Sequence, residues 1–249
     1  MLGERNGLHI WLTLHLPAPK PLMIAHRGTS GLEKENTCSA FVAAGNRSYF
    51  GIETDVHLTP DGKFIIIHDD DTLRVSGKMY AVEETNFETL RQIRLLDTDG
   101  RRGRADLLLP ELSEYTGICK KYEKVSVLEL KNHMPPEAVR QIAETIREDG
   151  WLDHTIFISF DLPNLLTLRE ALPEQPAQYL VSKIDNALLD TLKANRLDLD
   201  IWYKALTPEF VTACHNAQIK VNVWTVDTLE DCRRMTDWGG DYLPSNIVE

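Results

Sequence analysis

Short hydrophobic runs typical of β-strands alternate along this chain with patterns typical of amphipathic helices. Apolar residues recur at the helical spacing in Val139, Ile142, Ala143 and Ile146, and Gly150 follows as a stop. Similar patterns predict helices over 112–122, 162–172, 186–195, 208–217 and 228–238. The strand-like runs lie at 22–26, 50–55, 125–131, 155–160, 177–181, 199–203, 220–225 and 241–243. Eight strands joined by helices predict an α/β fold of the (β/α)8 TIM barrel class, with a doubly wound open sheet as the alternative.

Two irregularities interrupt this alternation. Residues 56–68 read as a hairpin with its turn at Pro60-Asp61-Gly62, and a turn this short joins antiparallel strands only. The hairpin therefore returns the chain to the end it left and places His68 near Glu53 and Asp55. The stretch from Asp69 to Lys124 is longer than one crossover needs, which predicts a small insertion, approximately 70–110, on the catalytic rim.

The remaining organisation is simple. We expect an N-terminal extension over 1–20 and one barrel domain over 21–249. The apolar stretch 8–16 is interrupted by His9, Thr13 and His15, which favours a short strand or packing arm over a signal peptide. No run of 18 apolar residues occurs, so the sequence predicts neither a spanning helix nor stable membrane insertion.

Charge and cysteine content narrow the function classes. In 249 residues, 27 Lys and Arg against 38 Asp and Glu give a net charge of −11, which argues against nucleic acid as a partner. The four cysteines contain no CxxC pair, which favours a reduced, cytoplasmic location. A homo-oligomer remains open at this point.

Ionisable residues gather at the carboxyl ends of the predicted strands, where barrels hold their active sites. Glu53 and Asp55 are two residues apart, so on a strand they share one face, and Glu129 and Lys131 do the same on the next strand. In a barrel that face is the lumen. Three carboxylates confined together repel one another, and a bound divalent cation relieves this repulsion. Oxygen ligands favour Mg²⁺ or Ca²⁺ over zinc.

Two histidines and two fixed cations belong to the same group. His26 and Arg27 end the first strand, and His68 ends the hairpin. A hard metal, two imidazoles, Arg27 and Lys131 make a site suited to cleaving a phosphate ester. One histidine would deprotonate the nucleophile and the other would protonate the leaving oxygen. The acidic run 69–71 after His68 is expected to be a solvated loop.

In these motifs the chain resembles the glycerophosphodiester phosphodiesterases. The ordered matches are His26-Arg27-Gly28, Glu35-Asn36-Thr37, Glu53-x-Asp55, Leu58-Thr59-x-Asp61-Gly62, His68-Asp69, Glu129-x-Lys131 and Val223-Trp224-Thr225-Val226. They span roughly residues 22–245. The resemblance implies a TIM barrel with an inserted segment after the hairpin. The chain departs from the family where Lys34 replaces a usual Pro and where Leu243-Pro244-Ser245-Asn246 replaces a Thr-Asp-x-Pro. Both departures bear on substrate preference more than on the reaction.

The resemblance also implies roles for individual residues. It makes His26 and His68 the catalytic acid–base pair, gives the metal to Glu53, Asp55 and Glu129, and sets Arg27 and Lys131 on the phosphate. Glu35 would belong to the site, while Asn36 reads as the N-cap of the following helix. Trp224 would line the alcohol pocket, where its ring could hold a choline-like cation.

The expected function is metal-dependent hydrolysis of glycerophosphodiesters, such as glycerophosphocholine or glycerophosphoethanolamine, in lipid and glycerol metabolism. The products would be glycerol 3-phosphate and an alcohol, formed through a cyclic phosphate. One alternative is a lysophospholipase D or sphingomyelinase D-type activity, which would favour an aromatic surface in 70–110, where only Tyr80 and Phe87 occur. A non-catalytic phospholigand-binding barrel is the other, but such a protein would be expected to have lost a histidine or a carboxylate.

Overall fold

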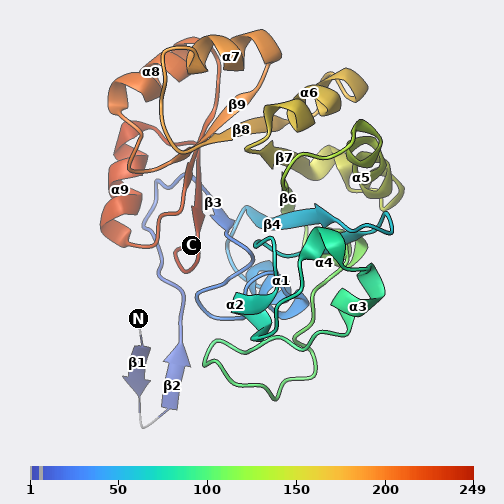
Figure 1. The fold of residues 1–249 in the computed structure, drawn as a ribbon. Coiled ribbons are helices and arrows are strands. Elements are labelled where there is room, and N and C mark those ends of the chain that lie inside the picture. The colour runs from blue at the N-terminus through green and yellow to red at the C-terminus, as the bar shows by residue number, and fades with distance from the viewer. Residues whose placement is uncertain (1, 6–7) are drawn as a thin grey trace.

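The computed structural model describes residues 2–5 and 8–249, and its centre is a closed barrel of parallel strands (Figure 1). Around the barrel the strands follow chain order, and the last pairs with the first, which also pairs with the second. This closure confirms the predicted TIM barrel and excludes the open sheet. The barrel strands are β3 (Leu22–Ala25), β4 (Gly51–Leu58), β6 (Val125–Leu130), β7 (Thr155–Ser159), β8 (Ala177–Val181), β9 (Asp198–Trp202), β10 (Val221–Trp224) and β11 (Tyr242–Ser245).

Helices cover the outside of the barrel (Figure 1). The apolar stripe of α5 is buried, as the spacing of Val139, Ile142 and Ile146 predicts, and Gly150 after it adopts a left-handed φ of 70°. A shell of apolar side chains between helices and strands forms the main core, and a smaller cluster fills the lumen. The outer helices are α1 (Cys38–Gly45), α4 (Leu112–Lys121), α5 (Pro136–Glu148), α6 (Leu162–Ala171), α7 (Leu188–Asn195), α8 (Pro208–Asn216) and α9 (Leu229–Trp238), and the 3-10 turn η2 (Leu152–His154) precedes β7.

Side-chain caps fix where several of these helices begin. Thr37, Asp161, Thr207 and Thr228 each accept a hydrogen bond from the backbone N–H three residues later. Such a cap stabilises a helix by about 1 kcal/mol. The prediction that Asn36 caps α1 is therefore wrong, because Thr37 does so.

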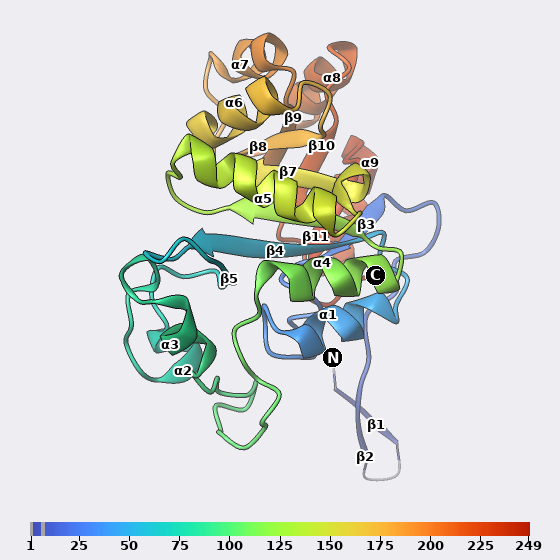
Figure 2. The ribbon, with the colours of Figure 1, turned by 90° about the vertical axis from the view of Figure 1, so that its right-hand side faces the viewer.

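The segment after the barrel's second strand has its own small core. β5 (Phe64–Ile66) pairs antiparallel with β4, which confirms the hairpin. Three short pieces follow, α2 (Leu73–Ser76), the 3-10 turn η1 (Val82–Glu84) and α3 (Phe87–Arg91), and Figure 2 shows α2 and α3 beside the far end of β4. Ile65 and Ile67 of the hairpin pack against apolar residues of this segment, namely Val75, Val82, Phe87, Leu90, Ile93, Leu95, Leu107 and Leu109.

The N-terminal stretch contains a separate two-stranded sheet and a segment that pairs with the C-terminus. β1 (Leu2–Arg5) and β2 (Leu8–Trp11) are antiparallel, and residues 1, 6 and 7 of the predicted extension lie outside the described residues. Leu14 N–H donates to Ile247 and Glu249 N–H donates back to Leu14, at 2.9 and 2.8 Å. The segment is therefore tied to the domain at its C-terminal end.

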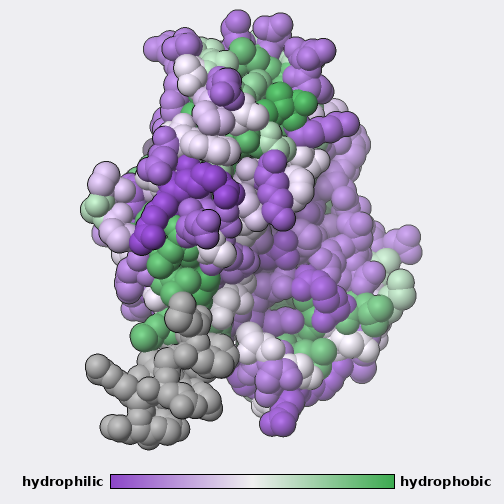
Figure 3. All heavy atoms as spheres, turned by 90° about the vertical axis from the view of Figure 1, so that its left-hand side faces the viewer, coloured by the Kyte–Doolittle hydropathy of each residue, from purple (hydrophilic) through white to green (hydrophobic). Residues whose placement is uncertain are grey.

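The described helices include none that is long and apolar enough to cross a bilayer. On the face shown in Figure 3, hydrophilic residues predominate and hydrophobic residues gather in separate patches. All four cysteines are free, and Cys119, Cys214 and Cys232 are buried.

Candidate active site

A cavity of about 190 Å³ opens at the carboxyl ends of the barrel strands. One part of its wall is ionisable and comes from the first barrel strands and the hairpin. The other part is apolar or uncharged for the most part and comes from β7 to β11. The lining residues are His26, Arg27, Glu53, His68, Glu129, Ile158, Phe160, Leu180, Asp200, Asn222, Trp224, Thr225 and Pro244.

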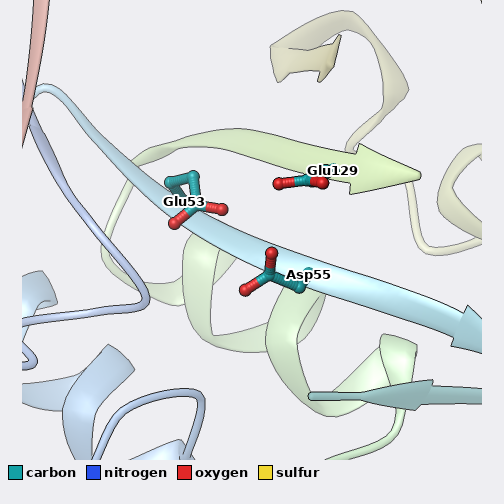
Figure 4. Close-up of side chains that lie close together, drawn as sticks. All are labelled: Glu53, Asp55 and Glu129. Carbon is teal, nitrogen blue, oxygen red and sulfur yellow. The ribbon is translucent and has the colours of Figure 1, made fainter. Parts of the chain in front are cut away.

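Three buried carboxylates converge in the ionisable part. Glu53 and Asp55 extend from β4 and Glu129 from β6, with one carboxylate oxygen of each within 4.8 Å of the others. Figure 4 shows the three carboxylates turned toward a common space. Alternation along β4 accounts for the shared direction of Glu53 and Asp55. Their number and oxygen chemistry fit a hard divalent cation.

Burial and neighbouring charges shift the pKa values of these three carboxylates. Burial and the neighbouring carboxylates raise the pKa of Glu53 and of Glu129 well above their ordinary values. Burial alone would also raise the pKa of Asp55, but Arg27 and Lys131 outweigh it and hold the pKa below its usual value. Like charges so close favour a proton on some members or a bound cation.

Two cationic side chains flank the carboxylates. Lys131 Nζ lies 3.0 Å from Glu129 Oε1 and 3.8 Å from Asp55 Oδ1. Arg27 Nε lies 3.8 Å from Asp55 Oδ2, while the Arg27 backbone N–H donates to Glu53 Oε2 at 2.7 Å. The left-handed φ of 52° at Arg27 belongs to the turn that brings this N–H to Glu53. Gly28 follows at φ 76°, where an added Cβ would lie 2.7 Å from Ala40 Cβ, so α1 packs too close for any larger residue.

The first histidine is oriented by residues at the far end of the chain. His26 Nδ1–H donates to Asn246 Oδ1 at 2.7 Å, and Asn246 Nδ2–H donates to Asp227 Oδ2 at 2.7 Å. In this tautomer Nε2 carries the lone pair and lies 4.0 Å from Glu53 Oε2. Burial and then Arg27 lower the pKa of His26 to about 4. The sequence analysis did not assign any role to Asp227 or Asn246.

The second histidine, His68, is also held through its Nδ1, by residues of the segment that follows the hairpin. His68 Nδ1–H donates to Asp69 Oδ1 at 2.7 Å, and Arg74 Nε–H donates to Asp69 Oδ2 at 2.6 Å. Burial is the largest influence on the pKa of His68 and lowers it. The expected solvated loop over 69–71 is thus incorrect for Asp69, because this carboxylate contacts both His68 and Arg74.

Glu35 joins Arg27 to the segment after the hairpin. Its Oε1 accepts from Arg27 at 2.9 Å, and Arg74 donates to both of its oxygens at 2.6 and 2.9 Å. Burial would raise the pKa of Glu35, but these arginines lower it to about 2. The carboxylate is therefore charged and fixes the position of Arg27.

Asn36 serves the site and not the helix. Its Nδ2–H donates to Asp55 Oδ2 at 2.8 Å, and its Oδ1 accepts from Thr54 at 2.7 Å. Its φ of 51° is left-handed, which removes it from the extended conformation of an N-cap. Asn36 therefore does not cap α1, because its amide is hydrogen-bonded to Asp55, one of the three buried carboxylates.

The part of the wall from β7 to β11 has aromatic residues at its rim and polar residues deeper in the lumen. Trp224 at the end of β10 lines the cavity, and the rings of Phe160 and Trp224 meet edge to face with centroids 5.8 Å apart. Deeper in the lumen lie Asp200 and Asn222, which the sequence analysis missed. Asp198-x-Asp200 repeats the spacing of Glu53-x-Asp55, and this spacing is the signal that could have revealed Asp200.

Comparisons with known proteins agree with this geometry. The model of the glycerophosphoryl diester phosphodiesterase family matches residues 26–246. A glycerophosphodiester phosphodiesterase of Caldanaerobacter subterraneus subsp. tengcongensis is 30% identical over 238 residues, which cover 92% of this chain and 96% of the relative.

Solved structures show the same arrangement of the chain. A glycerophosphodiester phosphodiesterase from Parabacteroides distasonis has a TM-score of 0.75 at 28% identity, with 91% of this chain and 94% of that chain covered. An Oleispira antarctica phosphodiesterase in complex with the product sn-glycerol-3-phosphate has a TM-score of 0.80 at 24% identity, with 94% and 96% covered.

Proposed function

The chain belongs to the glycerophosphoryl diester phosphodiesterase family, and on that premise we propose that it splits glycerophosphodiesters such as glycerophosphocholine or glycerophosphoethanolamine into glycerol 3-phosphate and an alcohol. The observation that carries this proposal is the convergence of two oriented histidines, three carboxylates and two cations in and directly beside one cavity. The product bound to the Oleispira antarctica relative agrees with it.

His26 and His68 would share the proton transfers. The glycerol 2-hydroxyl loses its proton to one histidine as its oxygen bonds to phosphorus. The other histidine gives a proton to the alcohol oxygen as the old P–O bond breaks. Water then opens the cyclic phosphate, with the proton transfers reversed. Both histidines donate through Nδ1, which leaves each Nε2 to exchange the proton.

Arg27 and Lys131 would hold the phosphate, since both are fixed cations beside the carboxylates. Glu53, Asp55 and Glu129 would hold a divalent cation, Mg²⁺ or Ca²⁺. When bound, the cation would supply positive charge for the phosphoryl oxygens. Glu35 would keep the Arg27 guanidinium in place, and Trp224 would contact the alcohol.

Release of glycerol 3-phosphate tests this proposal. Glycerophosphocholine and glycerophosphoethanolamine are each incubated with the protein in Mg²⁺, in Ca²⁺ and in excess EDTA. We expect release with at least one cation and its loss in EDTA, restored when the cation is added back. Release that EDTA does not reduce would contradict the metal dependence, and no release with either cation would contradict the substrate assignment.

A lysophospholipid substrate is the alternative to include in the same assay. In 70–110 Phe87 is buried in the segment's own core, which leaves Tyr80 as its exposed aromatic residue, with Leu73 and Met79 also exposed. Release of the head-group alcohol from a lysolipid, without turnover of glycerophosphocholine, would favour this alternative.

A further inference from the structure

Two polar residues form the deep wall of the cavity and have no role in the proposed reaction. Asp200 on β9 and Asn222 on β10 are register partners on neighbouring strands, 1% and 0% exposed, and both line the cavity. Most other residues on this part of the wall are apolar, such as Ile158 and Leu180. A barrel lumen normally closes with branched apolar residues, so this polar pair requires an explanation.

Each residue of the pair presents an oxygen that has no hydrogen-bond partner among the described residues, Asp200 Oδ1 and Asn222 Oδ1. Asn222 is held in this orientation because its Nδ2–H donates to Gln178 Oε1 at 2.7 Å. Asp198, two residues earlier on β9, instead accepts from Lys220 N–H at 2.8 Å. A buried polar atom without a partner costs about 1–3 kcal/mol, a cost that a ligand in the cavity would offset.

The chemistry of the pair selects hydrogen-bond donors. The metal-binding group comprises Glu53, Asp55 and Glu129 and does not include Asp200. Burial, and then the charge of Glu129, raise the pKa of Asp200 well above its ordinary value. Two neighbouring oxygens without partners both accept hydrogen bonds, which matches a hydroxyl group that donates one. A phosphate oxygen would find no cation here.

The size and shape of the site indicate which hydroxyl this is. A cavity of about 190 Å³ encloses a small group, and a bulky alcohol must extend past the rim, where Phe160 is 47% exposed. The nucleophilic glycerol hydroxyl has to lie by the carboxylates and histidines. The free primary hydroxyl is attached to the next carbon, so it is the substrate group that reaches inward from there.

We propose that Asp200 and Asn222 bind the free primary hydroxyl of the substrate's glycerol and thereby select glycerol esters over esters of other diols. This inference rests on the proposed function, since it assumes that the glycerol lies in the cavity. It assigns Asp200 and Asn222 to specificity and not to catalysis.

The test compares glycerophosphocholine with the phosphocholine ester of propane-1,2-diol, which keeps the nucleophilic hydroxyl and lacks the primary one. We expect the protein to favour the glycerol ester in kcat/KM by about 10- to 100-fold. Asp200→Leu should reduce this preference to about threefold or less. Asp200→Asn should retain most of it, because the amide oxygen can still accept the hydrogen bond. The matched control is Asp198→Asn, on the same strand but outside the cavity lining.

An unchanged preference in Asp200→Leu, or none in the unmodified protein, would overturn the proposal. The proposal would also be overturned if Asp200→Leu kept the preference for the glycerol ester but changed the ratio of glycerophosphoethanolamine to glycerophosphocholine turnover. The pair would then bind the ammonium group of the alcohol. Thermal unfolding checks that Asp200→Leu folds. If it does not, Asn222→Leu, which should also lower the preference, decides the question.

Binding separates this proposal from the proposed function. With divalent cation present, calorimetry compares glycerol 3-phosphate with propane-1,2-diol 1-phosphate. A tighter fit for glycerol 3-phosphate that Asp200→Leu abolishes supports the inference even if no diester is turned over. Equal affinities in the unmodified protein would overturn the inference even if turnover occurs.

Discussion

The two sides of the cavity differ in how their polar and charged groups are paired. On the side of β3, β4 and β6, most cationic and acidic groups lie beside a group of opposite charge, as in Lys131 with Glu129 and Arg27 with Glu35. On the side of β7 to β10, the wall is mostly apolar, and Asp200 and Asn222 there keep oxygens without hydrogen-bond partners among the described residues. Ion pairs therefore organise the charged side before any substrate arrives, whereas Asp200 on the neutral side forms none among the described residues.

From this difference we expect the charged side to serve the reaction and the neutral side to serve substrate recognition. Preorganised charges stabilise a transition state because they need no rearrangement during the reaction. Unpaired polar atoms in an apolar wall instead discriminate between ligands, since a ligand lacking the matching group leaves them unpaired. Substitutions on the charged side should therefore lower kcat, and those on the neutral side should change KM and selectivity.

The largest effect is expected for the histidines. His26→Ala and His68→Ala should each lower kcat by about 10²- to 10⁴-fold, because each would remove one of the proposed proton transfers. Turnover of glycerophosphocholine measures the loss, and circular dichroism verifies folding. His215→Ala, at an exposed histidine paired with Asp241, is the control and should leave kcat unchanged. A rate near that of the unmodified protein would remove the altered histidine from the mechanism.

The next effect concerns metal affinity. Glu53→Gln keeps the shape of the side chain and removes a charge from the group within which ligand oxygens lie 4.8 Å or less apart. We expect affinity for the divalent cation to fall by at least about tenfold, measured by calorimetry with Mg²⁺ and Ca²⁺. Glu144→Gln on the exposed face of α5 controls for net charge. Equal affinity in Glu53→Gln and Glu144→Gln would reject Glu53 as a ligand.

A smaller effect is expected at the aromatic rim. Trp224→Ala should raise KM for glycerophosphocholine by about fivefold with little change in kcat, because in the proposed function the ring would contact the alcohol and not the reacting atoms. Trp202→Ala, at an exposed aromatic residue on the neighbouring strand that does not line the cavity, is the matched control. If Trp224→Ala lowers kcat and leaves KM unchanged, the separation between the two sides fails at this residue.

The same contrast explains what could be predicted from the sequence. The strands and their alternation with helices follow from hydrophobic periodicity, which left an open sheet as the alternative to the closed barrel. The convergence of Glu53 with Asp55 follows from alternation along one strand. The contacts that orient the histidines do not follow, because Asn246 reaches His26 across 220 positions of the chain. Asp200 and Asn222 were missed because a polar residue within a strand normally indicates an exposed face.

Local competition between hydrogen bonds explains the error at Asn36. Both Asn36 and Thr37 suit an N-cap, and sequence preference alone does not separate them. The three-dimensional fold does, since Asp55 and Thr54 lie within hydrogen-bond distance of the Asn36 amide. A residue with two possible partners bonds to the one that tertiary structure brings near.

The smallest expected effect is on stability at acidic pH. It concerns the ion pairs that Arg74 forms with Glu35 and Asp69. The pKa of Glu35 is lowered from 4.5 to about 2 and that of Asp69 from 3.8 to about 2, and both accept hydrogen bonds from Arg74. A carboxyl with a lowered pKa in the folded state stabilises it fully above the unfolded pKa. This contribution is lost as the pH falls from about 4.5 through about 2.

Arg74→Met makes this contribution measurable. At neutral pH the variant should lose about 1 kcal/mol or less of the free energy of unfolding, because Arg74 is half exposed. The difference from the unmodified protein should shrink as the pH approaches 3, where the carboxyls gain protons as the chain unfolds. Urea unfolding at pH 7, 5 and 3 measures it, with Arg140→Met, at an exposed arginine on α5, as the control. A difference that stays constant over this range would show that the arginine acts through packing and not through charge.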